Sequence, residues 1–187
     1  YDRKVPKLRQ AGHCISCGAC LSHCPQGIAI DKEMKKIHNY VEALKQRKQV
    51  TDQVKDKLLA GNLSLVVETA NGDVLTFVGR GVKDLYHLYV KSPETLKGAI
   101  VADKVIVTGA ATLMALGGIK EYYTNVISED AFRILELKGI NGKYGELVAQ
   151  INNRDGSGRC PLETYLDGCT DSQDVLSRIT EFVNSIG

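Results

Sequence analysis

No apolar run in the 187-residue sequence approaches the ~20 residues that a membrane-spanning helix needs. The chain shows neither an initiator methionine nor the pattern of a signal peptide, so we expect a fragment or a processed chain whose upstream partner region is missing. No aromatic residues alternate with the basic ones as in nucleic-acid-binding segments. We therefore expect neither a membrane nor a nucleic acid among its partners, and the sequence does not indicate an oligomeric state.

Charge is nearly balanced overall, at +2, but it is distributed unevenly along the chain. Residues 1–60 carry 12 basic and 6 acidic side chains, a net charge of +6, and the remainder carries 12 and 16, a net charge of −4. A basic leading segment can attract an acidic redox partner. A lysine-rich, solvated helix face is the simpler explanation of the same pattern.

Six cysteines are present, and four of them lie within eleven residues. Secreted disulfide-stabilised domains spread their cysteines along the chain, whereas clustering is typical of metal ligation in a reducing compartment. We therefore predict a cytoplasmic protein. The length of the chain suits one sizeable domain with a small appendage.

The four clustered cysteines have the spacing C-x2-C-x2-C-x3-C-P that bacterial ferredoxins use for a 4Fe–4S cluster. Thiolates are soft ligands that suit iron, and the small Gly18 and Ala19 allow backbone N–H groups to approach the sulfides. Zinc sites normally come as two separated pairs. The predicted cluster ligands are Cys14, Cys17, Cys20 and Cys24.

The role of Cys24 has two alternatives. In two-cluster ferredoxins the fourth cysteine of each run ligates the other cluster, and this chain has only one run. Cys24 therefore either completes the same cluster or serves a second one whose other ligands lie upstream. A remote fourth ligand from Cys160 or Cys169 is disfavoured.

Residues 13–30 (HCISCGACLSHCPQGIAI), followed by a lysine-rich amphipathic helix, resemble the C-terminal ferredoxin-like segment of bacterial aldo/keto-reductase-type oxidoreductases. The resemblance covers about residues 1–50. It implies that the chain is the tail of a larger oxidoreductase whose reductase barrel and nicotinamide site precede it. Its partner would be that upstream domain or a separate redox protein.

Strands and helices alternate through the rest of the chain, which predicts an α/β sandwich with a mixed sheet. The Asn71–Gly72 pair indicates a type I′ hairpin turn. The expected strands span 63–69, 74–78, 99–102, 122–127 and 144–151. The expected helices span 31–48, 51–60, 82–91, 105–116, 128–138 and 172–185, with another opened by Pro161. Thr51 can cap the second of these helices, and residues 105–116 carry no charge, which suits a helix buried against a sheet. We place the domain boundary between residues 50 and 51.

Residues 55–170 resemble a small, uncharacterised bacterial family with a cytidine-deaminase-like fold. The stretches that carry the resemblance are 62–67, 102–105, 117–119, 127–129, 153–156 and 160–163. The resemblance implies a three-layer α/β/α sandwich and no established activity. Zinc deaminases need His-x-Glu on one helix and Pro-Cys-x-x-Cys on the next, and this sequence has neither, so we expect no zinc-dependent deamination.

The polar residues of this domain still suggest a site. Asp103 and Lys104 are expected at a strand–helix junction, where α/β sheets place ligands. Cys160 precedes the first turn of a helix, where a thiol pKa falls, which makes it a candidate nucleophile. Cys160, Asp103 and Lys104 are therefore the candidate catalytic groups; a buried small side chain is the alternative for Cys160 and helix capping for Asp103.

Five more residues are candidate ligand-binding groups. Ser128 and Glu129 open a helix, whose N-terminus favours anions, although capping explains Ser128 as well. Asn153, Arg154 and Asp155 belong to a polar loop beside Cys160 that could bind an anion, although Asp-Gly is also common turn chemistry.

The function that this sequence predicts is an iron–sulfur electron-transfer module fused to an α/β domain that binds a small molecule. One alternative is an enzyme that acts on a nucleotide-like molecule through Cys160, Asp103 and Lys104 without zinc. Another is a structural or sensor adaptor. The sequence alone leaves open whether the chain is an enzyme.

Overall fold

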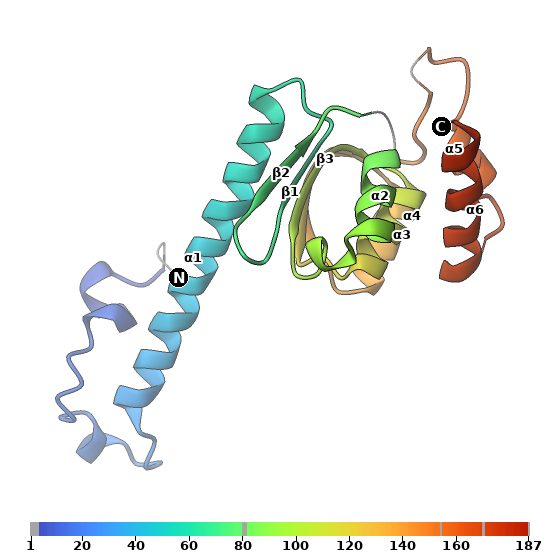
Figure 1. Cartoon of the computed structure of the whole chain (residues 1–187). Coiled ribbons are helices and arrows are strands. Elements are labelled where there is room, and N and C mark those ends of the chain that lie inside the picture. The colour runs from blue at the N-terminus through green and yellow to red at the C-terminus, as the bar shows by residue number, and fades with distance from the viewer. Residues whose placement is uncertain (1–3, 80–81, 154, 170, 187) are drawn as a thin grey trace. The chain divides into compact units, whose positions relative to one another are not determined.

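A computed structural model of the chain describes residues 4–79, 82–153, 155–169 and 171–186, without the side chains of 46–50. The chain forms two compact units, residues 1–49 and 50–187. Figure 1 shows the first unit in blue and the second in the remaining colours of the bar. In the part of the chain that is described, no helix is both long and apolar enough to cross a membrane.

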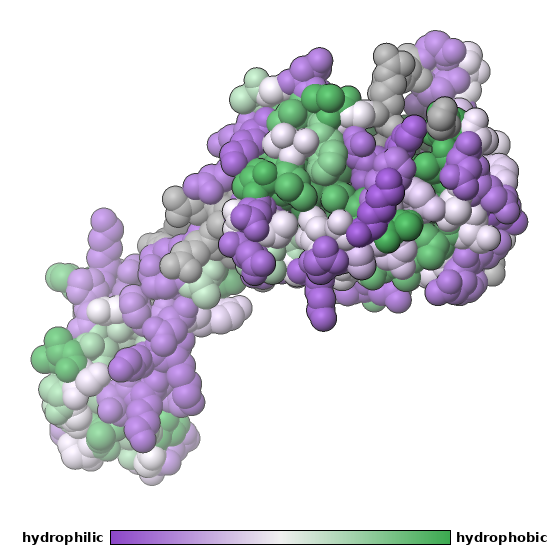
Figure 2. Space-filling model, viewed as in Figure 1, coloured by the Kyte–Doolittle hydropathy of each residue, from purple (hydrophilic) through white to green (hydrophobic). Residues whose placement is uncertain are grey.

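The first unit consists of a loop with single 3-10 turns followed by the start of a long helix. The turns span Lys7–Arg9, Ala11–His13 and Leu21–His23. Among the described residues of this unit, only Ala11 is a buried hydrophobic residue. Other hydrophobic residues, such as Ile15 at 84% exposure, remain at the surface, and Figure 2 shows hydrophobic patches on this unit. The unit therefore has almost no hydrophobic core of its own.

Helix α1 runs without interruption from Ile30 to Ala60, so the prediction of two helices before the α/β domain is wrong. No proline or glycine lies between residues 30 and 60 to end the helix, and Thr51 does not act as an N-cap. Instead, Thr51 is buried and its hydroxyl bonds the Glu121 carboxylate at 2.5 Å. The Thr51 side chain therefore makes a tertiary contact instead of capping a helix.

The second unit is built on a five-stranded mixed sheet, as predicted. Its order is β2-β1-β3-β4-β5; β1 pairs antiparallel with β2 and β3, and β3, β4 and β5 are parallel. The strands are β1 (Leu65–Glu68), β2 (Val74–Phe77), β3 (Ile100–Ile106), β4 (Glu121–Ser128) and β5 (Asn141–Val148). The other helices are α2 (Lys83–Lys91), α3 (Thr108–Gly117), α4 (Glu129–Leu137), α5 (Pro161–Tyr165) and α6 (Ser172–Ser185).

The β1–β2 hairpin closes through a three-residue loop. The Thr69 N–H donates to the Asp73 carbonyl at 2.9 Å, and the Gly72 N–H donates to the Thr69 carbonyl at 3.0 Å. Gly72 has φ of +90°, whereas Asn71 does not have positive φ. A type I′ turn needs positive φ at both central residues, so the turn is instead a type I turn followed by a left-handed glycine.

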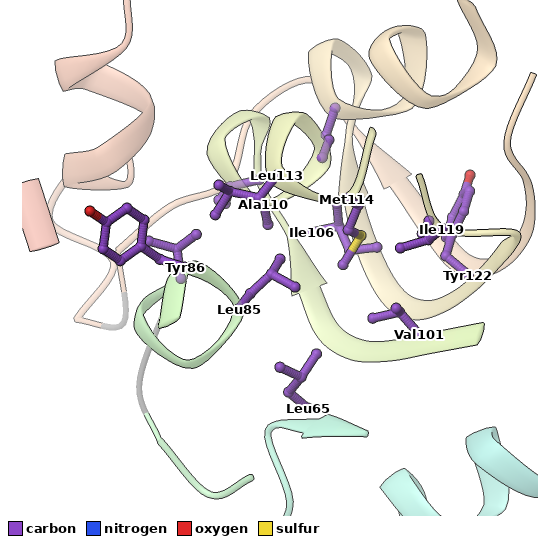
Figure 3. Close-up of a cluster of buried hydrophobic side chains, with 14 of the residues drawn as sticks. Leu65, Leu85, Tyr86, Val101, Ile106, Ala110, Leu113, Met114, Ile119 and Tyr122 are labelled. Carbon is purple, nitrogen blue, oxygen red and sulfur yellow. The ribbon is translucent and has the colours of Figure 1, made fainter. Parts of the chain in front are cut away.

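Helices cover both faces of the sheet, which gives three layers. On one face Val54 and Leu58 of α1 pack against Val66, Ala102 and Tyr123. On the other face α2, α3 and α4 lie over the sheet, with α6 packed outside α2 and α3 (Figure 1). Figure 3 shows the core beneath α3, where its buried apolar side chains meet those of β1, β3 and β4.

Along β3 and β4, the side chains stop alternating between the two faces of the sheet at one point, and this point lies at the same level on both strands. Val101 and Ile106 are five residues apart, yet both belong to the core under α3, and Tyr122 and Ile127 repeat this pattern on β4. Side chains an odd number of residues apart normally face opposite sides of a sheet. The break therefore lies between these positions.

Side-chain bonds to the backbone span this break on both strands. The Val105 N–H donates to Asp103 Oδ1 at 3.1 Å, and the Thr124 hydroxyl donates to the Val126 carbonyl at 2.9 Å. Such local bonds compete with regular strand geometry. They place Asp103 on β3 at the point where the strand changes the faces of its side chains.

Candidate functional site

A cavity of about 440 Å³ opens in the second unit beside β1, β3 and the start of α3. Most of its lining is apolar, and its polar members come from Ser64 just before β1, from β3 and from the segment before α5. The lining residues are Ser64, Leu65, Gly79, Val82, Asp103, Lys104, Val105, Val107, Ala110, Ile151, Asn152, Asn153, Cys160, Pro161, Leu162, Phe182 and Ile186. Its volume lies in the ~300–1,000 Å³ range typical of small-molecule pockets.

Sheet pairing brings the two strand walls of the cavity together. Leu65 on β1 lies opposite Asp103 on β3, and the Lys104 N–H donates to the Ser64 carbonyl at 3.2 Å. The facing wall is closed by the Cys160 N–H, which donates to the Ile151 carbonyl at 2.8 Å. The cavity thus joins residues that are up to 122 positions apart in the sequence, from Ser64 to Ile186.

Asp103 and Lys104 both line this cavity, but they do not lie where the sequence analysis placed them. We expected a strand ending at Ala102 with this pair at its carboxyl end, and β3 instead continues to Ile106. Charged residues disfavour a strand interior, which is why the pattern suggested an end there. Both side chains are half-buried.

Burial in this apolar setting, and to a smaller extent the nearby Asp84 carboxylate, raise the pKa of the Asp103 carboxyl to about 7. Backbone N–H groups of Val105 and Lys104 donate to the carboxyl and oppose this rise. Desolvation favours the neutral form of an acid, and a like charge acts in the same direction. Asp103 therefore exchanges its proton near neutral pH, which is typical of functional groups in clefts.

Cys160 also lines the cavity and is half-buried. Its carbonyl accepts the Thr164 N–H at 3.0 Å, so it directly precedes α5, as predicted. That helix has only five residues and provides little of the macrodipole that would favour a thiolate. Cys160 is thus placed where a reactive group could meet a ligand, but the short helix that follows it does little to activate its thiol.

The polar loop before Cys160 is organised by its own side chains. Asn153 Oδ1 accepts the Gly158 N–H at 3.2 Å, and its amide donates to the Ser157 hydroxyl at 2.9 Å. Asp155 accepts the Ser157 N–H at 2.9 Å, and this bond holds the pKa of the exposed carboxyl below its usual range. These bonds are turn chemistry, and of the two members of this predicted trio that the structure describes, Asn153 lines the cavity and Asp155 does not. Arg154 lies outside the described residues.

Ser128 and Glu129 do not line the cavity in the described part of the chain. Ser128 is buried, and its hydroxyl accepts the Ala131 N–H at 3.4 Å, so it caps α4. Glu129 is exposed and pairs with Arg133 at 3.2 Å on the surface of α4. Their interactions are those of a helix start.

Glu163 is a buried residue that the sequence analysis missed. One of its carboxylate oxygens accepts the Ile151 N–H at 3.2 Å and lies 3.7 Å from Nε of Arg159. Its side chain is almost fully buried, although charged residues are rarely buried without partners. It ties α5 to the segment that forms the facing wall of the cavity. In the sequence, the burial of Glu163 could have been suspected only because this glutamate lies on the apolar side of a short helix.

The cysteine run lies entirely within the described residues of the first unit. Ser16 and Gly18 have positive φ values of 55° and 75°, which curl the chain between the first three cysteines. The Ile28 N–H donates to the Cys24 sulfur at 3.4 Å. Among the described residues, no three His, Cys, Asp or Glu side chains form a group that could hold a metal ion as they stand. The donor chemistry nevertheless fits an iron–sulfur cluster, because all four groups are thiols at ferredoxin spacing.

Comparison with known proteins places the second unit in a family. The model of the family described as "TM1506: Domain of unknown function (DUF1893)" matches residues 53–183. The crystal structure of a DUF1893 family protein (TM1506) from Thermotoga maritima aligns with a TM-score of 0.60 and 21% identity, covering 74% of this chain and 88% of that chain. This likeness shows the fold. No curated protein matches the chain.

Proposed function

The chain belongs to the DUF1893 family, whose description assigns no activity, and we therefore propose a function from its own residues. The first unit holds a 4Fe–4S cluster and transfers single electrons. The second unit binds a small molecule in its cavity. The whole acts as an electron-transfer module of a larger oxidoreductase in the cytoplasm.

The observation that carries this proposal is the cysteine run with ferredoxin spacing at Cys14, Cys17, Cys20 and Cys24. The missing core of the first unit supports it. Segments of this size seldom fold on hydrophobic burial alone and are usually held by disulfides, metals or oligomerisation. Ala11 is the only buried hydrophobic residue among the described part of that unit, and a cluster would supply the missing cross-links.

The cluster, when bound, supplies one-electron chemistry at a potential that the surrounding residues set. The chain would supply the cysteine thiolates that hold the cluster and the backbone N–H groups that donate hydrogen bonds to their sulfur atoms. The Ile28 N–H that donates to Cys24 sulfur is such a donor, and hydrogen bonds to cluster sulfurs tune the potential. Cys24 either completes this cluster or serves a second one that is built with upstream residues.

The electron partner is a redox protein or a reductase domain that precedes this chain. The resemblance of residues 1–50 to the tails of aldo/keto-reductase-type oxidoreductases supports an upstream domain. The net charge of +6 over residues 1–60 supports docking on an acidic surface.

Anaerobic reconstitution with iron and sulfide tests the cluster. The full chain should become brown, contain about four irons per molecule, and bleach on reduction. Cys17→Ser should lose most of the iron and the colour, because serine replaces a soft thiolate by a hydroxyl. Cys169→Ser, which changes a half-buried cysteine of the second unit, is the matched control and should bind iron like the wild type.

Three results bear on the alternatives. Equal iron contents in Cys17→Ser and Cys169→Ser would contradict the proposal. A Cys24→Ser variant with the same iron content as the wild type would assign Cys24 to a second cluster, whereas a loss of about one iron per chain would assign it to this one. A chain that stays colourless under every condition would remove the cluster from this chain.

An enzyme that acts on a nucleotide-like small molecule through Cys160, Asp103 and Lys104 is the second candidate function. The observation that favours it is the position of all three residues on one cavity. In this function Asp103, whose pKa is about 7, takes the proton of the Cys160 thiol as the sulfur bonds to an electrophilic carbon of the ligand. The bond from that carbon to its leaving group breaks, and Asp103 returns the proton to the leaving group.

Alkylation by iodoacetamide at neutral pH tests this nucleophile. An activated Cys160 should react about tenfold faster in the native chain than in the chain unfolded by urea, because the thiolate is the reacting form. Cys169 should react more slowly in the native chain, because burial raises the pKa of its thiol. Peptide mass spectrometry measures both rates in one sample. A native rate for Cys160 at or below its unfolded rate would reject the second candidate.

A further inference from the structure

We propose that the cavity of the second unit binds an organic cation, an ammonium or amidinium group carried on an apolar body, with Asp103 as its counter-ion. This inference rests on the small-molecule-binding role proposed above and names the class of ligand. Three features of the described residues lead to it.

The first feature is the apolar wall. Leu65, Val107, Ala110, Leu162 and Phe182 line the cavity together with other aliphatic residues. Pockets of this kind gain most of their affinity by burying the apolar surface of a ligand, while a few polar groups fix its orientation. The body of the ligand is therefore a hydrocarbon or an aromatic ring.

The second feature is a carboxyl without a counter-ion. Asp103 is half-buried among these apolar groups, and within the described part of the chain its carboxyl accepts hydrogen bonds from backbone N–H groups alone. No ion pair joins it to Lys104 or to another basic side chain in the described part of the chain. Buried charges are normally paired. A bound cation would provide the missing partner and make the ionised form of Asp103 favourable.

The third feature is the charge around Asp103. Among the described residues, Asp84 from α2 acts on Asp103 through its charge, and Lys104 from β3 and Cys160 from the segment before α5 are the other titratable groups that line the same cavity. Asp84 places its carboxylate against the backbone of Gly79, where a Cβ would collide with it, and Gly79 lines the cavity. Its field acts on Asp103. Near the cavity, the carboxylates of Asp103 and Asp84 outnumber the ammonium group of Lys104. This balance of charge favours a cationic ligand over an anionic one.

The ionisation of Asp103 gives this proposal a pH signature. A cation binds the carboxylate form, and the pKa of about 7 in the free protein means that this form increases about tenfold between pH 6 and pH 8. Affinity for a cation should therefore rise about tenfold over that range. A neutral ligand that accepts a hydrogen bond from protonated Asp103 would show the opposite trend.

The test is a titration of the full chain followed by NMR, with three probes that share one apolar body. The cation is 2-phenylethylamine, the neutral probe is 2-phenylethanol, and the anion is 3-phenylpropanoate. Backbone signals of Val105, Ala110 and Leu162 report on the cavity. The amine should shift these signals with at least tenfold higher affinity than the alcohol or the anion at pH 8.

Two variants complete the test. Asp103→Asn should reduce the affinity for the amine to that for the alcohol and abolish its pH dependence. Asp73→Asn, which changes an exposed carboxylate of the hairpin loop outside the cavity, should leave both unchanged.

The outcomes separate this inference from the binding role on which it rests. Equal affinities of the amine and the alcohol, with no effect of Asp103→Asn, would overturn the cation class but keep the cavity as an apolar binding site. A preference for 3-phenylpropanoate would also overturn it and point to Lys104 as the anchor. If none of the three probes shifts the cavity signals, the cation class and the small-molecule-binding role both fail.

Discussion

Replacing Asp103 by asparagine should make the protein more stable at pH 8 and should remove a pH dependence of about 2–3 kcal/mol between pH 5 and pH 8. The pKa of Asp103 is about 7 in the folded protein, against roughly 3.9 in the unfolded chain. The folded state thus holds the proton more tightly, so ionisation favours unfolding. Stability is lost as pH rises from about 4 towards 7. Asparagine cannot ionise, and it keeps an oxygen that can accept the Val105 N–H.

Urea unfolding at pH 5 and pH 8 measures this effect. The wild type should lose about 2–3 kcal/mol more than Asp103→Asn over this interval. Asp73→Asn, at an exposed position, controls for the general change in protein charge. Parallel pH profiles for the wild type and Asp103→Asn would mean that the carboxyl titrates in the folded protein as it does in the unfolded chain.

Gly142→Ala should destabilise the second unit by about 2–3 kcal/mol, although Gly142 lies on an exposed edge strand. An added Cβ at this position would fall within contact distance of three ring atoms of Tyr122. Tyr122 is 2% exposed and belongs to the core under α3, so its ring has no free space to move into. The gain of up to ~1 kcal/mol that alanine brings by restricting the unfolded chain does not offset this overlap.

Gly158→Ala is the matched control for this prediction. Gly158 lies in the loop before Cys160, and a Cβ added there has no neighbour within 4 Å. Its substitution should change the free energy of unfolding by less than about 1 kcal/mol. If both variants unfold at the same urea concentration as the wild type, the tight contact between β5 and Tyr122 is not maintained in solution.

Local sequence patterns predicted the kind and order of most elements in the second unit. The alternation of strands with helices after the hairpin gave a mixed sheet, and the charge-free run that contains α3 gave a buried helix. Ser128 was weighed as a helix cap and is one. These predictions depend on patterns within one element, where residue type and geometry are directly linked.

Features that depend on contacts between elements were not predictable in this way. The charges of Asp103 and Lys104 suggested that β3 ends there, but the strand continues past the point where its side chains change faces. This change requires the neighbouring strand β4 to change faces at the same level. The hairpin loop differs from the predicted turn by one residue, since Asn71 does not take positive φ. Thr51 looked like a cap and is used by Glu121, seventy positions away.

The candidate site shows the same division. Asp103 and Lys104 were chosen as neighbours at an expected strand end and Cys160 as the residue before a helix, and the fold brings all three to one cavity. Ser128 and Glu129 were chosen for an equally valid local reason, the start of a helix, and lie elsewhere. Glu163 was missed because its importance comes from burial and from its contacts with the preceding segment. Local sequence patterns indicate which residues could be functional, but the arrangement of the strands and helices decides which of them lie together in one site.

The wall contributed by α6 has a consequence for the order in which the cavity forms during folding. Phe182 and Ile186 line the cavity, and the Tyr86 hydroxyl on α2 bonds the Thr180 hydroxyl on α6 at 3.1 Å across 94 positions. Contacts of such long sequence separation form late, because a long stretch of chain must be closed first. The sheet can therefore assemble before α6 packs against α2 and α3. The cavity is complete only after that last packing step, so its state reports on the finished fold of the second unit.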